Sequence, residues 1–566
     1  MISPRRIFLA SVSTFVLAAS LCFTTTGCHP KAASHPEPFT AKLTEIEGVQ
    51  AVYTLRHPKL INGELEHLMT AVPEAALARM FLGQLSAYGY PEFSEFAADT
   101  NIGIALLEMS ADDLKAGNPV FVAVAKLKEG GKIWSILKQS GLSLEKKGEW
   151  VWIAKEASAI AAVKNPAALI AHISQPQTEE VRIWGRVSPA LLAAAKTALF
   201  PKLEAKLATL PSADQKAALA YADVLWGYLA QLHSAGGAID LNERGLGFSY
   251  YGQFLPDSAT GTLLRYAHPA SPKITESVPA DGLLSVVVRQ NIPGQIAFVT
   301  GVLDALSAVN YPAGADALKA AKAAYLGLSE HNDGGVVASI NMSLPKASQP
   351  PEMDMLGVYT GHYTEAEITN AYKSTLSFSE KFTHSLLQTI SLVTPGHPVP
   401  TVTQKHTENA LTIDGISFGS VVTTTVMPIG DTQQTNVTTQ YYGVVNGNLI
   451  FASNEATLRA KLPAIAGKRP VANPIKIVLK GDEFGVMVLH GEKIVDAVVT
   501  ATAVDTTDAD IQAQIKSMKD GYAAAEPVTT TVNVAQAKAE LAVFIPYSFV
   551  TQSLRLAQFA NAHKAK

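Results

Sequence analysis

The clearest pattern along the chain is an extended apolar segment that reaches a proline and is followed by an amphipathic stretch. Proline has a fixed φ and no N–H group, so it suits the first turn of a helix and keeps the preceding residue extended. Each occurrence therefore predicts a strand that passes into a helix. The pattern occurs at Val49 to Leu55 before Pro58, Val181 to Val187 before Pro189, Leu283 to Arg289 before Pro293, and Leu541 to Ile545 before Pro546.

A second pattern links two distant stretches. Residues 147–154 (KGEWVWIA) lead into a helix predicted at Glu156, and residues 446–452 (NGNLIFA) lead into one predicted at Glu455. In both, a hairpin turn at glycine precedes an apolar strand, and an acidic residue lies where the helix dipole favours it. A further strand and helix is predicted upstream of each stretch. An ancient duplication and a chance similarity between two common α+β units both account for this likeness.

The rest of the body alternates between helices and strand pairs. Residues 189–232 are rich in alanine and leucine and predict helices interrupted at Pro201 and Pro211, whereas residues 237–254 predict a strand pair around a polar turn. Further expectations are a linker at 344–353, an exposed loop at 394–410, and a solvated hairpin formed by 421–427 and 437–445.

These elements predict an α+β fold, in which repeated strand-helix-hairpin modules form curved antiparallel sheets backed by helices. The length of 566 residues is large for one hydrophobic core and suggests several domains. The predicted organisation is a signal peptide at 1–27, a flexible tether at 28–45, a first α+β module at 46–180, a helix-rich α+β module at 181–347, a second copy of the first module at 348–470, and a C-terminal α+β module at 471–566.

The N-terminus has the parts of an export signal. Arg5 and Arg6 precede an apolar stretch, Ile7 to Phe23, which is interrupted by serine and threonine and is marginal for a permanent membrane span. The following residues, Thr25-Thr26-Gly27-Cys28, resemble the lipobox of bacterial lipoproteins. This resemblance implies that Cys28 is modified with diacylglycerol and becomes the new N-terminus. An ordinary cleaved signal peptide and a retained anchor helix are the alternatives.

The cysteine content agrees with a lipid anchor. The chain has two cysteines, Cys22 inside the apolar stretch and Cys28 at the proposed cleavage point. The exported body therefore has no disulfide, and an acylated Cys28 leaves no thiolate for catalysis or metal binding. Several acyl chains, at roughly 0.8 kcal/mol per buried methylene, make such an anchor close to permanent.

Charge and hydropathy exclude two other classes of protein. The formal net charge is −4, and removing Arg5 and Arg6 with the signal gives −6. Nucleic acid binding is not expected, because it depends on clustered cations that face phosphates, and no dense basic block follows the signal. The mean hydropathy of +0.15 is high. However, charged residues interrupt every long apolar run after Cys28, so no second membrane segment is expected.

Several short motifs suggest chemistry, but a structural explanation fits each one better. Gly415-Ile416-Ser417-Phe418-Gly419 has the spacing of a nucleophile elbow, yet a β-branched run follows where a helix is required, so we expect a β-turn. Ser135-Ile136-Leu137-Lys138 matches the S-x-x-K motif without its companion motifs. Asp508 and its acidic neighbours Asp505 and Asp510 predict an N-cap and not a calcium loop.

The sequence evidence for metal ligands and for carbohydrate-binding aromatic residues is equally weak. Glu64 and His67 have the spacing of half a di-iron site, but no convincing second pair exists. His29 and His35 lie in the predicted tether, where solvation is the simpler explanation. Trp150 and Trp152 suggest a sugar-stacking platform, with core packing as the favoured alternative. We therefore expect no cofactor, no metal and no catalytic residue.

Two functions remain after these exclusions. The favoured one is a lipid-anchored, non-catalytic binding or scaffold protein of the bacterial cell envelope, with its body in the periplasm. Its partners are the membrane, through lipidated Cys28, and other envelope proteins or lipid. The alternative is a carrier or chaperone for lipid or another apolar ligand. His29, directly after Cys28, resembles the pattern linked to outer-membrane sorting.

Overall fold

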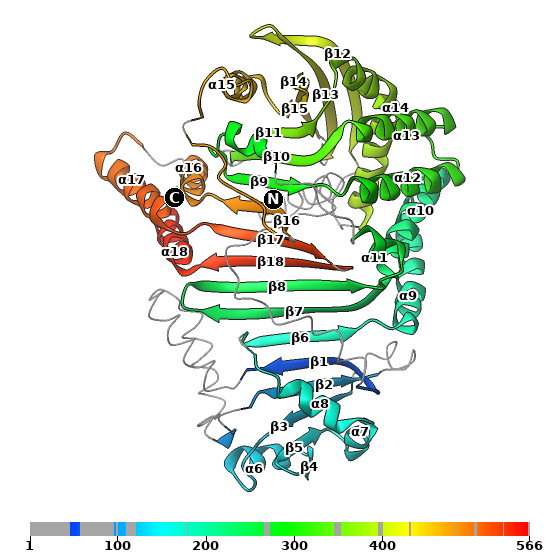
Figure 1. Ribbon diagram of the computed structural model, residues 1–566, viewed down its shortest axis with the longest axis vertical. Coiled ribbons are helices and arrows are strands. Elements are labelled where there is room, and N and C mark those ends of the chain that lie inside the picture. Colours follow the sequence, from blue (N-terminus) through cyan, green and yellow to red (C-terminus); the bar gives the residue numbers. More distant parts are fainter. Residues whose placement is uncertain are drawn as a thin grey trace.

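The chain folds around one large antiparallel sheet, as shown by a computed structural model (Figure 1). The structure describes residues 46–56, 95–97, 100–108, 120–177, 179–264, 272–343, 352–393, 400–429, 432–471, 473–481, 483–502, 506–535 and 537–563. Within these residues the sheet has 18 strands, and every pair of neighbouring strands is antiparallel.

The pairings give the order of the strands across the sheet. From one edge to the middle, they are β4 (Ser143–Lys147), β5 (Trp150–Ala154), β3 (Phe121–Ala125), β2 (Ile102–Leu107), β1 (Val49–Leu55), β6 (Val181–Arg186), β7 (Leu232–Asn242) and β8 (Gly245–Phe254). From the middle to the other edge, they are β18 (Lys538–Pro546), β17 (Val528–Ala535), β16 (Glu483–Leu489), β9 (Leu284–Arg289), β10 (Asn332–Ser343), β11 (Glu352–Gly361), β15 (Asn448–Ala452), β14 (Thr432–Val445), β13 (Ile416–Ile429) and β12 (Thr401–Ile413).

The two halves of the sheet meet where β8 pairs with β18. Ser249 lies opposite Ala542 at the middle of this pair. The order β5-β3-β2-β1-β6-β7-β8 on one side of the junction has a counterpart, β15-β11-β10-β9-β16-β17-β18, on the other. Strands of corresponding position therefore have corresponding neighbours in both halves.

Most of the helices form two groups at opposite ends of the strands (Figure 1). One group contains α9 (Pro189–Leu207), α10 (Ser212–Leu229), α12 (Ile292–Ala308), α13 (Ala315–Glu330) and α14 (Glu365–Val393). The other contains α16 (Gly491–Thr502), α17 (Ala509–Ala524) and α18 (Tyr547–Ala562). The remaining helices among the described residues are α6 (Lys132–Gln139), α7 (Ala157–Ala162), α8 (Pro166–Ile173), α11 (Ala259–Leu263), α15 (Glu455–Ile465) and the 3₁₀ helix η2 (Lys273–Ser277).

Two hydrophobic cores lie towards the two ends of the same face of the sheet. In the first, Trp152 and Trp184 pack with Leu169 of α8 and are almost fully buried. In the second, Val358 and Ile450 pack with residues of α15. Burying each large apolar side chain stabilises the fold by about 1.5–3 kcal/mol. We name this side of the sheet the helix-covered face, because α7, α8 and α15 pack on it.

The prolines produce the strand-to-helix junctions that the sequence predicts. Pro189 begins α9 directly after β6, and Pro293 lies in the first turn of α12 after β9. Pro546 is the N-cap of α18 and also ends β18. The fourth junction, at Pro58, falls outside the described residues. The hairpin turns also occur as expected, since Gly148 and Gly447 both have positive φ, which glycine adopts without a steric penalty.

The α+β class and the antiparallel pairing are confirmed, but three expectations need correction. The helix expected to be interrupted at Pro201 is continuous there, because Pro201 lies inside α9. The strands belong to one sheet and not to several, because β8 and β18 hydrogen-bond across the middle. The loop expected at 394–410 is wrong for its second part, since β12 begins at Thr401. The linker expected at 344–353 falls largely outside the described residues. The module boundaries at 46–180, 181–347, 348–470 and 471–566 stay predictions. No helix among the described residues is both long and apolar enough to span a membrane.

Candidate functional site

The central strands of the sheet present a continuous apolar surface on the side opposite the helix-covered face. Residues that lie directly opposite each other in antiparallel strands point to the same face, and so do residues two apart in one strand. One row across the sheet is Tyr53, Ile183, Gly237, Tyr250 and Leu541. The adjacent row is Leu55, Val181, Ile239, Phe248 and Val543.

We name this surface the apolar face. Its larger side chains come from β1, β6, β7, β8 and β18 and are Tyr53, Leu55, Val181, Ile183, Ile239, Leu241, Leu246, Phe248, Tyr250, Leu541, Val543 and Ile545. The other positions that the register places on this side are Leu232, Phe254, alanines and glycines, so the tyrosine hydroxyls are the only polar side-chain groups at these paired positions.

The apolar face is exposed to a degree that is unusual for central strands. Tyr250 is 60% exposed, Tyr53 41%, and Ile239 and Leu541 37% each. Its other large side chains are partly exposed. Five strands about 4.8 Å apart, each contributing roughly 20 Å of length, make a surface on the order of 400 Å². The largest apolar patch on a typical soluble monomer is about 300–600 Å² and is often functional, so a surface of this size is a candidate binding site.

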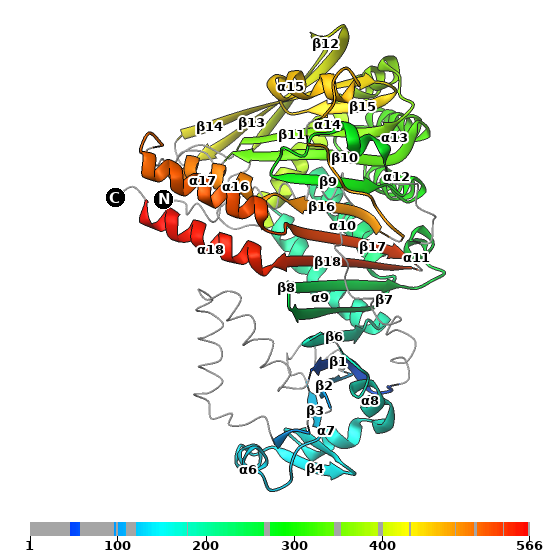
Figure 2. The same ribbon diagram turned by 60° about the vertical axis from the view of Figure 1, so that its left-hand side comes forward.

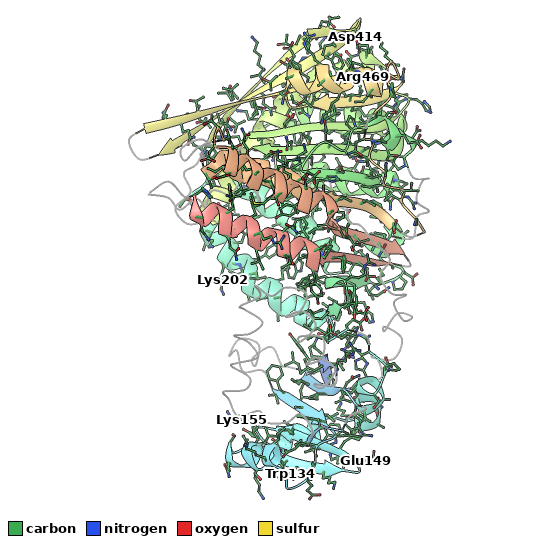
Figure 3. The ribbon with its side chains drawn as sticks, turned by 90° about the vertical axis from the view of Figure 1, so that its left-hand side faces the viewer. Trp134, Glu149, Lys155, Lys202, Asp414 and Arg469 are labelled. Atoms are coloured by element: carbon green, nitrogen blue, oxygen red, sulfur yellow. The ribbon has the colours of Figure 1, made fainter. Side chains whose placement is uncertain are left out.

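Two groups of helices flank the apolar face. Figures 2 and 3 show α9 and α10 at one end of the central strands and α16, α17 and α18 at the other, all on the same side of the sheet. Helix α8 lies on the opposite side, where Ile173 packs against Gly103. The apolar face is therefore the floor between two helical groups.

The opposite side of the same strands carries a charged cluster in which Arg182, Glu179 and Glu540 are buried and Lys538 is partly exposed. Arg182 and Glu179 form an ion pair of 2.5 Å, and Lys538 pairs with Glu540 at 3.0 Å. The Lys538 Nζ also lies 4.9 Å from the centre of the Tyr251 ring, a cation–π contact between β18 and β8. The two acids and two bases balance, as buried charges require. The two ion pairs account for these charges, so we assign the cluster a structural role.

Burial shifts the pKa values of groups in and beside this cluster. Desolvation lowers the pKa of His172 to about 4, with a smaller contribution from Arg182, so this imidazole is neutral near pH 7. Desolvation raises the pKa of Glu180 to about 7, although hydrogen bonds from the Leu241 amide and from Arg56 oppose it. Desolvation also raises the pKa of the Tyr251 phenol, so it stays protonated.

Two hollows in the described part of the chain are lined by residues outside the apolar face. One of about 390 Å³ lies between α17 and α18 and is lined by Gln514, Ser517, Met518, Arg555, Gln558, Phe559, Ala562 and His563. Another, of about 10 Å³, lies beside Tyr442 and is no larger than a water molecule. Neither is an enclosed cavity with an aliphatic lining.

The structure explains the candidate residues that it describes. Gly415 has positive φ in the β12–β13 turn, and Ser417 belongs to β13, so the expected β-turn is confirmed. The Ser135 hydroxyl donates to the Gly131 carbonyl within the first turn of α6. The Asp508 side chain accepts hydrogen bonds from two amides of α17, so the expected N-cap is confirmed. Trp150 and Trp152 are buried together, which confirms core packing.

Other predicted residues cannot be placed, because Cys28, His29, His35, Glu64, His67 and Asp505 fall outside the described residues. In the described part of the chain, no group of three or more His, Cys, Asp or Glu side chains is arranged to hold a metal ion. The chain matches no protein-family model, no curated protein and no solved structure.

Sequence reasoning did not identify the apolar face. The period-two alternation in residues 237–254 indicates that one side of this strand pair is apolar. It does not indicate whether another element covers that side. The sequence does allow the predicted apolar strands to be counted against the predicted helices that could cover them. Using that count to find an uncovered face requires the order of the strands in the sheet, which the sequence does not give.

Proposed function

We propose that the protein is a lipid-anchored, non-catalytic binding protein of the bacterial cell envelope, whose body lies in the periplasm. The observation that carries the proposal is the exposed apolar face of the central strands. Leaving several aliphatic and aromatic side chains in water costs stability, at about 25 cal/mol per Å² of apolar surface. A partner that covers this face recovers that free energy.

The environment of the candidate nucleophiles supports a non-catalytic role. Catalytic hydroxyls need a base within hydrogen-bonding distance. The Ser135 hydroxyl instead donates to a backbone carbonyl of its own helix, and the Ser417 hydroxyl donates to the Asn409 side chain across the hairpin. Both serines thus take part in local structure.

Cys28 is the proposed point of attachment. Seventeen residues lie between Cys28 and Ile46, where the described body begins. Fully extended, such a segment spans about 60 Å. A diacylglycerol group on Cys28 therefore holds the apolar face within a short distance of the membrane, with the outer membrane favoured by His29.

An internal duplication underlies the repeated strand-helix-hairpin modules in this proposal. The matching order of strands in the two halves supports it, and so does the hairpin at Gly148, which occupies the same place in the order as the hairpin at Gly447. The two copies proposed from this strand order are longer than the predicted modules. The first copy runs from β1 to β8, and the second runs from β9 to β18.

One experiment tests the anchor. The full-length protein is purified from its native membrane and digested, and the peptide that contains Cys28 is measured by mass spectrometry. We expect an N-terminal cysteine that carries diacylglycerol. An unmodified thiol, or a mature chain that begins elsewhere, contradicts the anchor.

A second experiment tests binding at the apolar face. Carbene footprinting compares the protein in native membranes with the purified protein and measures labelling of Tyr250 and Leu541. We expect lower labelling of both residues in membranes. Val437, which is 58% exposed on β14, is the control and should be labelled equally in both states. Equal labelling of all three residues contradicts occupation of this face.

A further inference from the structure

We infer that the apolar face binds the acyl chain of a phospholipid taken from the membrane that holds the anchor. This inference rests on the proposed function, since the anchor is what keeps the face beside a bilayer. It deepens that function by naming the chemical class of the ligand.

The absence of hydrogen-bonding groups argues for a hydrocarbon ligand. Protein interfaces carry about one hydrogen bond per 100–200 Å², so a protein partner on roughly 400 Å² would need two to four. Apart from the hydroxyls of Tyr53 and Tyr250, the side chains of the apolar face have no polar atoms. Each of its five strands is paired on both sides, so the backbone offers no ladder for an added strand. A hydrocarbon chain needs neither hydrogen-bonding side chains nor an unpaired strand edge.

The dimensions of the face suit an acyl chain. Each of its strands contributes roughly 20 Å of length. One leaflet of a bilayer core is about 15 Å thick, half of the 30 Å total. An extended acyl chain therefore fits along or across these strands with all of its methylenes in contact.

The flanking helices favour single lipid molecules over the bilayer surface. Helices α9 and α10 at one end, and α16, α17 and α18 at the other, stand out on the same side as the apolar face (Figures 2 and 3). A flat membrane meets these helices before it reaches the floor between them. A chain that leaves the bilayer reaches Tyr250 and Leu541, which lie side by side on β8 and β18.

Photo-crosslinking tests this assignment. The acylated full-length protein is placed in vesicles that contain a phosphatidylglycerol with a diazirine on one acyl chain. After illumination, adducts are mapped by mass spectrometry. We expect adducts on β7, β8 and β18, centred on Ile239, Tyr250 and Leu541. Adducts spread equally over other exposed apolar residues, such as Val437 and Val478, would overturn the assignment.

Two substitutions and a matched control sharpen the test. Ile239→Asn and Leu541→Asn each place an amide on the apolar face and should lower the adduct yield about fivefold or more, because hydrocarbon contact is lost. Val437→Asn makes a comparable change at an exposed position of β14 and should leave the yield unchanged. Equal yields from all three variants would overturn the proposal. Circular dichroism before illumination confirms that each variant is folded.

Chain length and lipid source supply independent readouts. If the acyl chain is the ligand, each methylene added to a short-chain phosphatidylglycerol that is supplied as monomers in water should tighten binding by up to about fourfold, at roughly 0.8 kcal/mol per methylene. An affinity that does not depend on chain length overturns the proposal. If a diazirine fatty acid in solution labels the apolar face and the vesicle phospholipid does not, the membrane is not the source of the ligand and the proposal is overturned. The Cys28 peptide is measured in the same digest, so loss of the anchor is distinguished from loss of lipid binding.

Discussion

The phenol of Tyr251 lies directly over Gly236 on the neighbouring strand. The two residues are register partners in the β7–β8 pair, and a Cβ added at position 236 would lie 2.5 Å from the Tyr251 oxygen. The same Cβ would lie 2.4 Å from the Ile183 carbonyl oxygen. Glycine at this position therefore lets the ring reach across β7 towards the buried cluster beneath the apolar face.

Gly236→Ala should destabilise the protein because neither the ring nor the β6 backbone can move freely away from the new methyl group. Overpacking of this kind costs about 1–3 kcal/mol. Urea denaturation should show the loss as a lower midpoint with an unchanged slope. Gly327→Ala is the control, since nothing lies within 4 Å of the position and it is in the interior of α13. That change should stabilise by about 0.5–1 kcal/mol. Equal effects of the two substitutions would refute the contact.

Tyr251→Phe should leave stability unchanged or raise it by about 1 kcal/mol. The Tyr251 hydroxyl is buried and has no hydrogen-bond partner among the described residues, so removing it relieves an unsatisfied polar group. Tyr522→Phe is the matched case. Its hydroxyl bonds the Ser553 hydroxyl at 3.0 Å, and its loss should cost about 1 kcal/mol. Thermal unfolding of both variants measures the difference, and a reversed order of stabilities would contradict it.

Glu180 should make the protein less stable as pH rises from about 4.5 to about 7. Burial raises the pKa of Glu180 to about 7 from its ordinary 4.5, so in this window the folded state holds a proton that the unfolded state has lost. The loss amounts to about 3 kcal/mol at most, at 1.36 kcal/mol per pKa unit. Glu180→Gln should remove this contribution, so the stability of the variant, measured by urea denaturation at several pH values, should fall less with rising pH than that of the parent. A variant with the slope of the parent would contradict the raised pKa.

His172 should act in the opposite direction. Burial lowers the pKa of His172 to about 4 from 6.5, so the unfolded state takes up a proton between these values before the folded state does. Stability is therefore lost as pH falls through this window. In the parent protein the two slopes partly cancel where the windows overlap. His172→Gln should unmask the Glu180 slope, and a His172→Gln variant with a flatter profile than the parent would contradict this account.

Asp508→Ala should cost about 1 kcal/mol, because the side chain accepts hydrogen bonds from the amides of Asp510 and Ile511 at the start of α17. Asp510→Ala is the control in the same turn. Asp510 lies in the first turn of α17, where the helix dipole stabilises its carboxylate, so its loss should cost about 0.3–1 kcal/mol and the cost should fall in high salt. Denaturation at two salt concentrations separates the two effects.

Local chemistry made much of the fold predictable. The β9–α12 junction is an example, because Pro293 suits the first helical turn and Asn291 caps the helix with its side chain. The turn at Gly415 was predictable for a related reason, since a β-branched run cannot readily continue as a helix. These features depend on a few neighbouring residues.

Features set by distant partners were not predictable. Strand β12 is rich in threonine and other polar residues and mostly exposed, so its sequence resembles a loop. Its strand geometry comes from pairing with β13. The apolar face was also not predictable from local sequence. Its side chains were recognisable as strand residues, but the face forms only when β8 pairs with β18, and these strands are almost 300 positions apart in the chain.

The position of β1 in the sheet has a mechanical consequence. A pull on the chain before Ile46 loads β1, which is held by β2 on one side and by β6 on the other. The strand cannot be peeled from an edge, so the force must shear two rows of hydrogen bonds at once. A body tethered at this end resists traction better than one whose first strand forms the border of its sheet.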